Sequence, residues 1–400
     1  MNRLSLWCSP LTPALLTTFL AIVAASAGCA GATHGQQANA PNAGNAVSVP
    51  TTYVTPLDAG TLQQRFDSAV GMLAAGKFKD AAAQFDLIAQ FEPQGRLAAA
   101  SLFNAGFAYE QCNDRSTAMA RYASVVRQFP QGTEAGSALL RGTRVLSWME
   151  DWSQLATFAD MLLARTDLAP IERVEALGAR ALGLVEQGQD DPALAAVSKA
   201  RTLIEDNGWG DSGPPPLAAA QVFFSLGEVR RMQGERIVFS PTPANFGEVL
   251  ERRCQALLDA QEAYSQAMRA RDAHWAAMAG YRIGQLYQQL HLDVMSIAPP
   301  ATAKTDEQKA LFFGAMQLRY RVLIEKGLKM INATLEMAEK TKENSVWVNR
   351  AREAKRDLEK TLRGTQDVLA KLPYREEDLQ RALAGLAAPK VAPEATKPAP

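Results

Sequence analysis

Small and large apolar residues alternate with polar ones at fixed spacing through much of the chain. In the stretch AGFAYEQCNDRSTAMARYASVVRQFP, Gly106 lies three residues before Tyr109, Ala118 lies four before Tyr122, and Pro130 follows eight residues later. A catalytic loop requires polar groups that converge on one point, and this stretch has almost none. The spacing instead predicts two amphipathic helices that pack against each other.

The same pattern returns elsewhere in the chain. An upstream copy matches the second-helix positions at a constant shift of 37 residues, with Ala81, Phe85 and Pro93. A downstream copy has Ala260 and Tyr264 at the same spacing. The step from the second-helix aromatic residue to the next first-helix Gly is 20 or 21 residues in three separate places. This nearly constant spacing indicates an internal repeat, in which each unit is a helix–turn–helix.

Each part of the repeat has a physical role. The small residue of the first helix lets the second helix approach closely, and the aromatic residue of the second helix fills the space beside it. The Pro that follows stops the second helix, and the Gly in AAGKF at residues 74–78 supplies the turn between helices. One pair cannot bury both of its faces, so neighbouring pairs must stack.

These residues resemble the tetratricopeptide repeat (TPR). The signature positions are Ala69, Gly76, Ala81, Phe85, Pro93, Gly106, Tyr109, Ala118, Tyr122, Pro130, Gly142, Ala260, Tyr264, Gly284 and Tyr287. The units around Gly142, Gly188 and Gly227 depart from the pattern, because Trp152 and Leu155 replace expected residues in the third unit and Arg230 stands where an aromatic is usual. The resemblance implies an all-α fold, a right-handed α-solenoid of five to six helix hairpins with long C-terminal helices.

The resemblance also implies a binding groove. In this family the groove is lined by first-helix side chains at set offsets from the small residue. Carried onto this sequence, the groove residues are Phe66, Val70, Phe103, Phe107, Glu110, Leu139, Phe224 and Arg231. An exposed aromatic row would suit an extended peptide or a partner helix. The alternative is that several of these side chains fill space between neighbouring helices.

The repeats are interrupted by segments of loop composition. The compositions of Glu205–Pro216 and Glu235–Phe246 predict loops, and we interpret the second as an insertion that packs over the stack. After Ala298–Pro300 the sequence changes to longer charged helices, the first of which begins with a capping box of Thr305 and Gln308. This end either caps the solenoid or forms a helical hairpin.

The N-terminus reads as an export signal. Arg3 gives a positive start, Leu11–Ala25 is apolar, and small residues follow. The sequence SAGC resembles a bacterial lipobox, which implies lipidation of Cys29. Ser26 stands where that pattern usually has a large aliphatic residue, so a conventional small-x-small cleavage site at residues 25–27 is the alternative.

The chain therefore divides into five predicted segments. They are a signal peptide (1–28), a flexible linker (29–57), the TPR-like array (58–296), a C-terminal helical region (303–385) and a disordered tail rich in Pro and Ala (386–400).

Composition narrows the chemistry. The 42 basic and 42 acidic residues balance, which argues against a nucleic-acid surface. We find no motif for a nucleophile, a phosphate loop or a metal, and predict no catalytic residue, no metal and no cofactor. His274 and His291 are too far apart for one helix-face ligand pair and are expected to be partly exposed. Cys112 and Cys254 lack CxxC context and are expected to remain separate.

The sequence as a whole predicts a non-enzymatic scaffold for protein partners, with no small-molecule substrate. The long repeat period and the QFEP and QFP endings resemble envelope TPR proteins of the outer-membrane assembly and Tol-Pal machineries. YRIGQLYQQLHLDVMSIAPP resembles a stretch of deltaproteobacterial repeat lipoproteins, including one of the adventurous gliding machinery. The resemblances imply a lipid-anchored protein on the periplasmic face of the outer membrane. The alternative is a soluble periplasmic protein that modulates cell-wall or Tol-Pal-type machinery.

Overall fold

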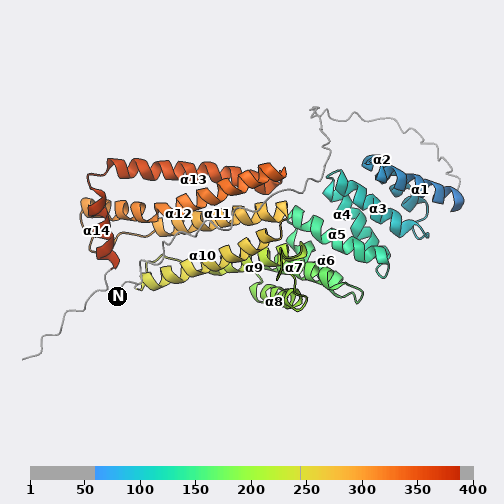
Figure 1. The fold of residues 1–400 in the computed structure, drawn as a ribbon, viewed down its shortest axis with the longest axis horizontal. Coiled ribbons are helices and arrows are strands. Elements are labelled where there is room, and N and C mark those ends of the chain that lie inside the picture. Colours follow the sequence, from blue (N-terminus) through green and yellow to red (C-terminus); the bar gives the residue numbers. More distant parts are fainter. Residues whose placement is uncertain (1–58, 244, 388–400) are drawn as a thin grey trace, which may run out of the picture. The chain divides into compact units, whose positions relative to one another are not determined.

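The computed structural model describes residues 59–243 and 245–387. The described residues form fourteen α-helices and no β-strand. The helices are α1 (Ala59–Ala74), α2 (Phe78–Phe91), α3 (Ala98–Gln111), α4 (Arg115–Gln128), α5 (Thr133–Met149), α6 (Trp152–Leu163), α7 (Pro170–Glu186), α8 (Asp190–Asp206), α9 (Ala218–Glu235), α10 (Phe246–Arg269), α11 (Ala273–Met295), α12 (Asp306–Thr341), α13 (Val346–Lys371) and α14 (Glu376–Ala387). Consecutive helices pack as pairs, and successive pairs stack (Figure 1). The predicted all-α solenoid of helix hairpins is confirmed.

Tight turns within the hairpins share one construction. Gly76 between α1 and α2 has a φ of 74°, the left-handed conformation that glycine adopts without strain. The turns after α3 and α5 place Asn113 and Glu150 in that region instead. In these two turns an aspartate comes next and caps the following helix, with Asp114 accepting a hydrogen bond from the Thr117 amide at 3.1 Å. The chain therefore reverses direction within three residues.

The predicted contact between small residue and ring is present at the centre of the hairpins. A Cβ atom added to Gly106 of α3 would lie 2.7 Å from Cε1 of Tyr122 in α4. The same holds for Gly227 of α9, where the added Cβ would lie 2.5 Å from the ring of Tyr264 in α10. Tyr122 and Tyr264 are fully buried. Only glycine allows the two helices of each pair to approach this closely.

In the third hairpin, the second-helix aromatic residue is one that the repeat alignment did not identify. Gly142 of α5 faces Phe158 of α6, at 2.9 Å from an added Cβ. The signal was present in the sequence, because Phe158 follows Gly142 by the same 16 residues that separate Gly106 from Tyr122. Gly188 has a different role: its φ of 76° places it in the turn between α7 and α8, as Gly76 is between α1 and α2.

The sixth pair consists of α11 and α12. Gly280 and Gly284 of α11 lie against Thr334 and Ile331 of α12, with added Cβ atoms 2.1 and 2.5 Å from those side chains. The sequence change after Pro300 is thus a connection inside a helix pair, since the repeat packing continues into α12. The predicted capping box is present: Thr305 Oγ1 accepts from the Gln308 amide, and the Gln308 side chain accepts from the Thr305 amide. Next in the chain, α13 packs on α12 and α11, and α14 packs on α12.

The connection between α9 and α10 contributes to the core. Phe239 is 3% exposed and its ring meets that of Phe246 edge-on, with centroids 5.4 Å apart. The predicted insertion over the stack is therefore anchored by an aromatic side chain. The predicted signal peptide, the linker and most of the C-terminal tail lie outside the described residues.

Candidate functional site

The predicted groove residues of the first two repeats lie on equivalent faces of α1 and α3. Phe66 and Val70 of α1 are repeated, 37 residues later, by Phe103 and Phe107 of α3. Val70 is 42% exposed, and the three phenylalanines are half-buried. We call these four side chains the α1/α3 face. They form an apolar surface that remains partly open to solvent.

The corresponding side chains of later repeats are not accessible. Leu139 of α5 is 3% exposed and Phe224 of α9 is 1% exposed, so both belong to the core and not to a groove. Phe224 packs between the rings of Tyr264 and Trp275, each with centroids 5.4 Å away. For these two residues the space-filling alternative holds, because the helices stacked on them cover the first-helix face.

The half-buried phenylalanines also support the hairpins. The ring of Phe66 meets that of Phe85 edge-on at 5.5 Å, and the ring of Phe103 lies 5.9 Å from that of Tyr122. Phe66 and Phe103 therefore each contact a second-helix ring and remain partly exposed. Val70 is the most exposed of the four side chains, which makes it the cleaner probe of the surface.

Glu110 is the polar edge of the α1/α3 face. Its carboxylate accepts a hydrogen bond from the Tyr122 hydroxyl at 2.8 Å and two from the Arg141 guanidinium at 3.0 Å. The Arg141 guanidinium also lies over the Phe107 ring, 4.4 Å from its centroid. Burial and the nearby Glu110 carboxylate raise the pKa of Tyr122, so the hydroxyl stays a donor. The predicted residue Glu110 thus fixes the position of Phe107 through Arg141.

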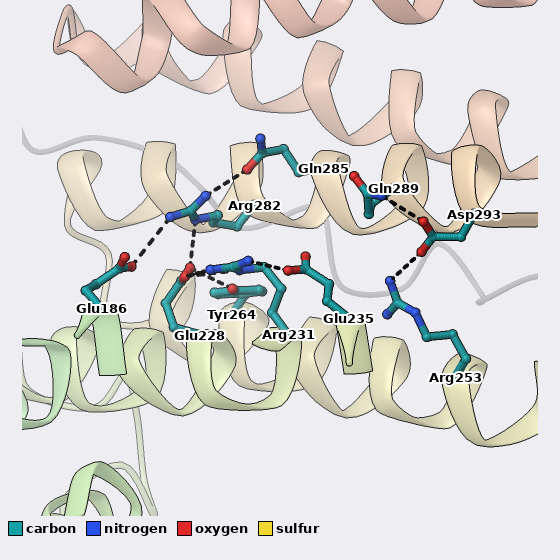
Figure 2. Close-up of polar contacts among 10 residues, drawn as sticks. All are labelled: Glu186, Glu228, Arg231, Glu235, Arg253, Tyr264, Arg282, Gln285, Gln289 and Asp293. Carbon is teal, nitrogen blue, oxygen red and sulfur yellow. Dashed lines mark hydrogen bonds and ion pairs between the residues drawn. The ribbon is translucent and has the colours of Figure 1, made fainter. Parts of the chain in front are cut away.

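A second, larger polar cluster joins α7, α9, α10 and α11 (Figure 2). At its centre Glu228 of α9 is fully buried. It accepts from the Tyr264 hydroxyl at 2.7 Å and from Arg231 Nη2 at 2.6 Å, and Arg282 Nε lies 2.7 Å away as an ion pair. A buried carboxylate needs such partners, because an unpaired one would carry its full desolvation cost.

Predicted groove residue Arg231 belongs to this cluster. Besides Glu228 it contacts Glu235 at 2.7 Å, and its side chain is 13% exposed. It therefore pairs within its own helix and offers little surface to a partner. Farther along the same helices, the buried Arg253 of α10 lies 3.1 Å from Asp293 of α11. This second pair joins α10 to α11 (Figure 2).

Two glutamates of the cluster, Glu186 and Glu228, have pKa values shifted in opposite directions. Burial, followed by the charge of Glu228, raises the pKa of Glu186 to about 7. The pKa of Glu228 is lowered below its ordinary value. Burial alone would raise it, but the positive charges of Arg282 and Arg231 outweigh the effect of burial. Glu186 has one distant charge partner, Arg282 Nη2 at 3.5 Å. Its proton is therefore exchanged near neutral pH while Glu228 remains ionised.

A third cluster joins parts of the chain far apart in sequence. Trp148, at the end of α5, stacks on His274 of α11 with ring centroids 3.7 Å apart. Glu150, in the turn after α5, forms two hydrogen bonds with Arg350 of α13, at 2.7 and 3.0 Å. Sequence reasoning missed this cluster, because no local motif marks a pair 200 residues apart. The fold, and not the repeat pattern, brings α13 to the third hairpin.

The histidines differ from expectation. His274 and His291 are each 5% exposed, so the prediction of partly exposed side chains was wrong. Stacking against the Trp148 ring covers His274, and burial lowers the pKa of His291. Cys254 is a free thiol in α10, so it does not pair with Cys112 at the end of α3.

Within the described ranges, no group of three or more His, Cys, Asp or Glu side chains is arranged to hold a metal ion. None of the described helices is both long enough and apolar enough to cross a membrane.

Comparisons with known proteins found similar solved structures but no matching family. No family model matches the sequence, and no curated protein does. A tetratricopeptide repeat protein from Parabacteroides merdae is 12% identical, covering 76% of this chain and 98% of that one, with a TM-score of 0.38. A TPR repeats protein from Bacteroides fragilis is 11% identical, covering 66% and 98%, with a TM-score of 0.27.

The yeast Sti1 TPR2AB domain, solved in complex with an HSP90 peptide, is 10% identical, covering 77% and 100%, with a TM-score of 0.21. The fold is TPR-like. We base this conclusion on the glycine–ring contacts of the hairpins described above, because the sequence identities and TM-scores are too low to support it.

Proposed function

We propose that this protein is a non-enzymatic scaffold that holds a protein partner on the α1/α3 face. The observation that carries the proposal is the difference between repeats. Phe66, Val70, Phe103 and Phe107 remain partly open to solvent, whereas Leu139 in the third repeat is buried. Apolar side chains that repeat along a surface and lack a covering helix favour an extended peptide or a helix as ligand.

The location of the scaffold is proposed from the sequence. The apolar N-terminal segment and SAGC favour export and lipidation at Cys29, on the periplasmic face of the outer membrane. More than one acyl chain would anchor the protein stably, whereas one chain binds only marginally. The partners would then belong to an envelope machine, of which gliding motility and outer-membrane assembly are the two candidates. A soluble periplasmic form acting on Tol-Pal-type machinery is the second candidate.

Site-specific photo-crosslinking in the native host tests the binding surface. A photoreactive residue at Val70 should give a discrete adduct with an envelope protein. The same residue at Leu87 of α2, which is 38% exposed, should not. In an affinity pull-down from the same host, Val70→Glu should abolish capture of that protein without loss of helicity, because Val70 is exposed. Equal capture from both positions, or capture that survives Val70→Glu, would refute the α1/α3 face as the site.

Palmitate labelling tests the anchor separately. The wild type should incorporate label and fractionate with the outer membrane, and Cys29→Ala should do neither. An unlabelled wild type would leave the soluble periplasmic form as the better description.

A further inference from the structure

The α1/α3 face lies on the first helices of the hairpins. A separate cleft lies between α6 and α8, which are the second helices of the third and fourth hairpins. It has a volume of about 720 Å³, and α7 forms its floor. The helices on either side differ in length: α6 has 12 residues and α8 has 17. At 1.5 Å per residue, α8 is about 7.5 Å longer than α6.

The cleft combines an apolar interior with polar edges. Leu177 of α7 is the buried floor, and Leu163 of α6 and Leu203 of α8 are half-buried walls. Ser198 and Thr202 of α8 are exposed along one edge. The cleft, lined by α6, α7 and α8, can take the apolar side of a helical segment.

The charges at the cleft are mostly positive. Arg173, Arg180 and Lys199 line it, with Asp160 as the only acidic lining residue, and Arg180 pairs with Asp160 at 2.5 Å. Among the described residues no carboxylate lies within 4.0 Å of Arg173 or Lys199. Arg173 instead donates to the Arg165 carbonyl at 3.4 Å, which holds its guanidinium at the end of the cleft. Two positive charges are left for a ligand.

We propose that this cleft binds an acidic amphipathic segment of a protein partner, distinct from the ligand of the α1/α3 face. The apolar side of the segment would cover Leu163, Leu177 and Leu203, and its Asp or Glu side chains would pair with Arg173 and Lys199. Charge complementarity of this kind selects partners and speeds encounter. A recessed cleft between helices fits a helix, whereas a bilayer surface is flat and would not reach the floor.

Selection from a random peptide display library against the full chain tests the proposal. Enriched peptides should carry Asp or Glu next to Leu or Phe at helical spacing. A synthetic peptide of the enriched sequence should bind the double variant Arg173→Glu/Lys199→Glu at least about tenfold more weakly than the wild type, because two attractive charges become repulsive. Ala195→Trp, which fills the cleft from an exposed position, should abolish binding.

The matched control is Arg201→Glu. Arg201 is an exposed residue of α8 that pairs with Glu205 and does not line the cleft, so this variant should bind as the wild type does. Circular dichroism confirms that each variant is folded. Enrichment without acidic residues, or binding unchanged in the double variant and in Ala195→Trp, would overturn the proposal. So would binding to phosphatidylglycerol vesicles that depends on Arg173 and Lys199, since the cleft would then serve a membrane surface.

Discussion

The close approach at Gly106 gives the sharpest test of the hairpin packing. In Gly106→Ala the new Cβ would lie 2.7 Å from Cε1 and 2.9 Å from Cδ1 of Tyr122. The ring cannot move aside easily, because it is fully buried and its hydroxyl is held by Glu110 and Arg141. Overpacking of this kind costs about 1–3 kcal/mol, against a gain of about 1 kcal/mol in helix propensity.

Gly71 of α1 is the matched control. It lies in a helix, is exposed, and has no heavy atom within 4 Å of an added Cβ. Gly71→Ala should therefore gain only the higher helix propensity of alanine, which stabilises the protein by about 1 kcal/mol. Urea denaturation followed by circular dichroism should separate the two alanine variants by about 1–3 kcal/mol. Amide exchange in α3 and α4 locates the effect, since repeat proteins can open locally.

Removing the ring should reverse the sign at Gly106. Tyr122→Ala leaves no ring to clash with, so Gly106→Ala in that background should be neutral or stabilising. The coupling between the two substitutions measures the contact itself. If Gly106→Ala stabilises the otherwise wild-type chain as much as Gly71→Ala does, the small-residue argument for the hairpins is wrong.

The remaining predictions concern the polar clusters. The raised pKa of Glu186 means that its contribution to folding stability is full below about pH 4.5 and is lost as pH rises through about 7. Glu186→Gln should remove this loss, on the order of 3 kcal/mol at pH 8, as read from denaturation midpoints across pH. An unchanged pH profile would contradict the assignment. Arg350→Ala and Glu150→Ala should show a coupling of about 1 kcal/mol in a double-mutant cycle, because the pair is bidentate and partly exposed. A coupling near zero would mean that the ion pair does not hold α13 to the third hairpin.

The sequence by itself determined the helix pairs and the way in which they pack. A glycine that must accept a ring leaves a local signature, and the spacing from Gly106 to Tyr122 or from Ala69 to Phe85 can be read without coordinates. The turn at Gly76 and the cap at Thr305 are local in the same sense. They depend on backbone conformation and on hydrogen bonds within a few residues.

The tertiary structure decided which of the repeated positions remain on the surface. Phe103 and Leu139 stand at equivalent places in their repeats, yet only Phe103 keeps an open side, because the helices stacked beyond the third hairpin cover the later face. The pairing of Glu150 with Arg350, and the neighbouring stack of Trp148 on His274, likewise had no local signal. Contacts between residues a hundred or more positions apart depend on how each hairpin is rotated relative to the one before it and on where the long final helices pack. This arrangement accumulates over many hairpins, so no short stretch of sequence encodes it.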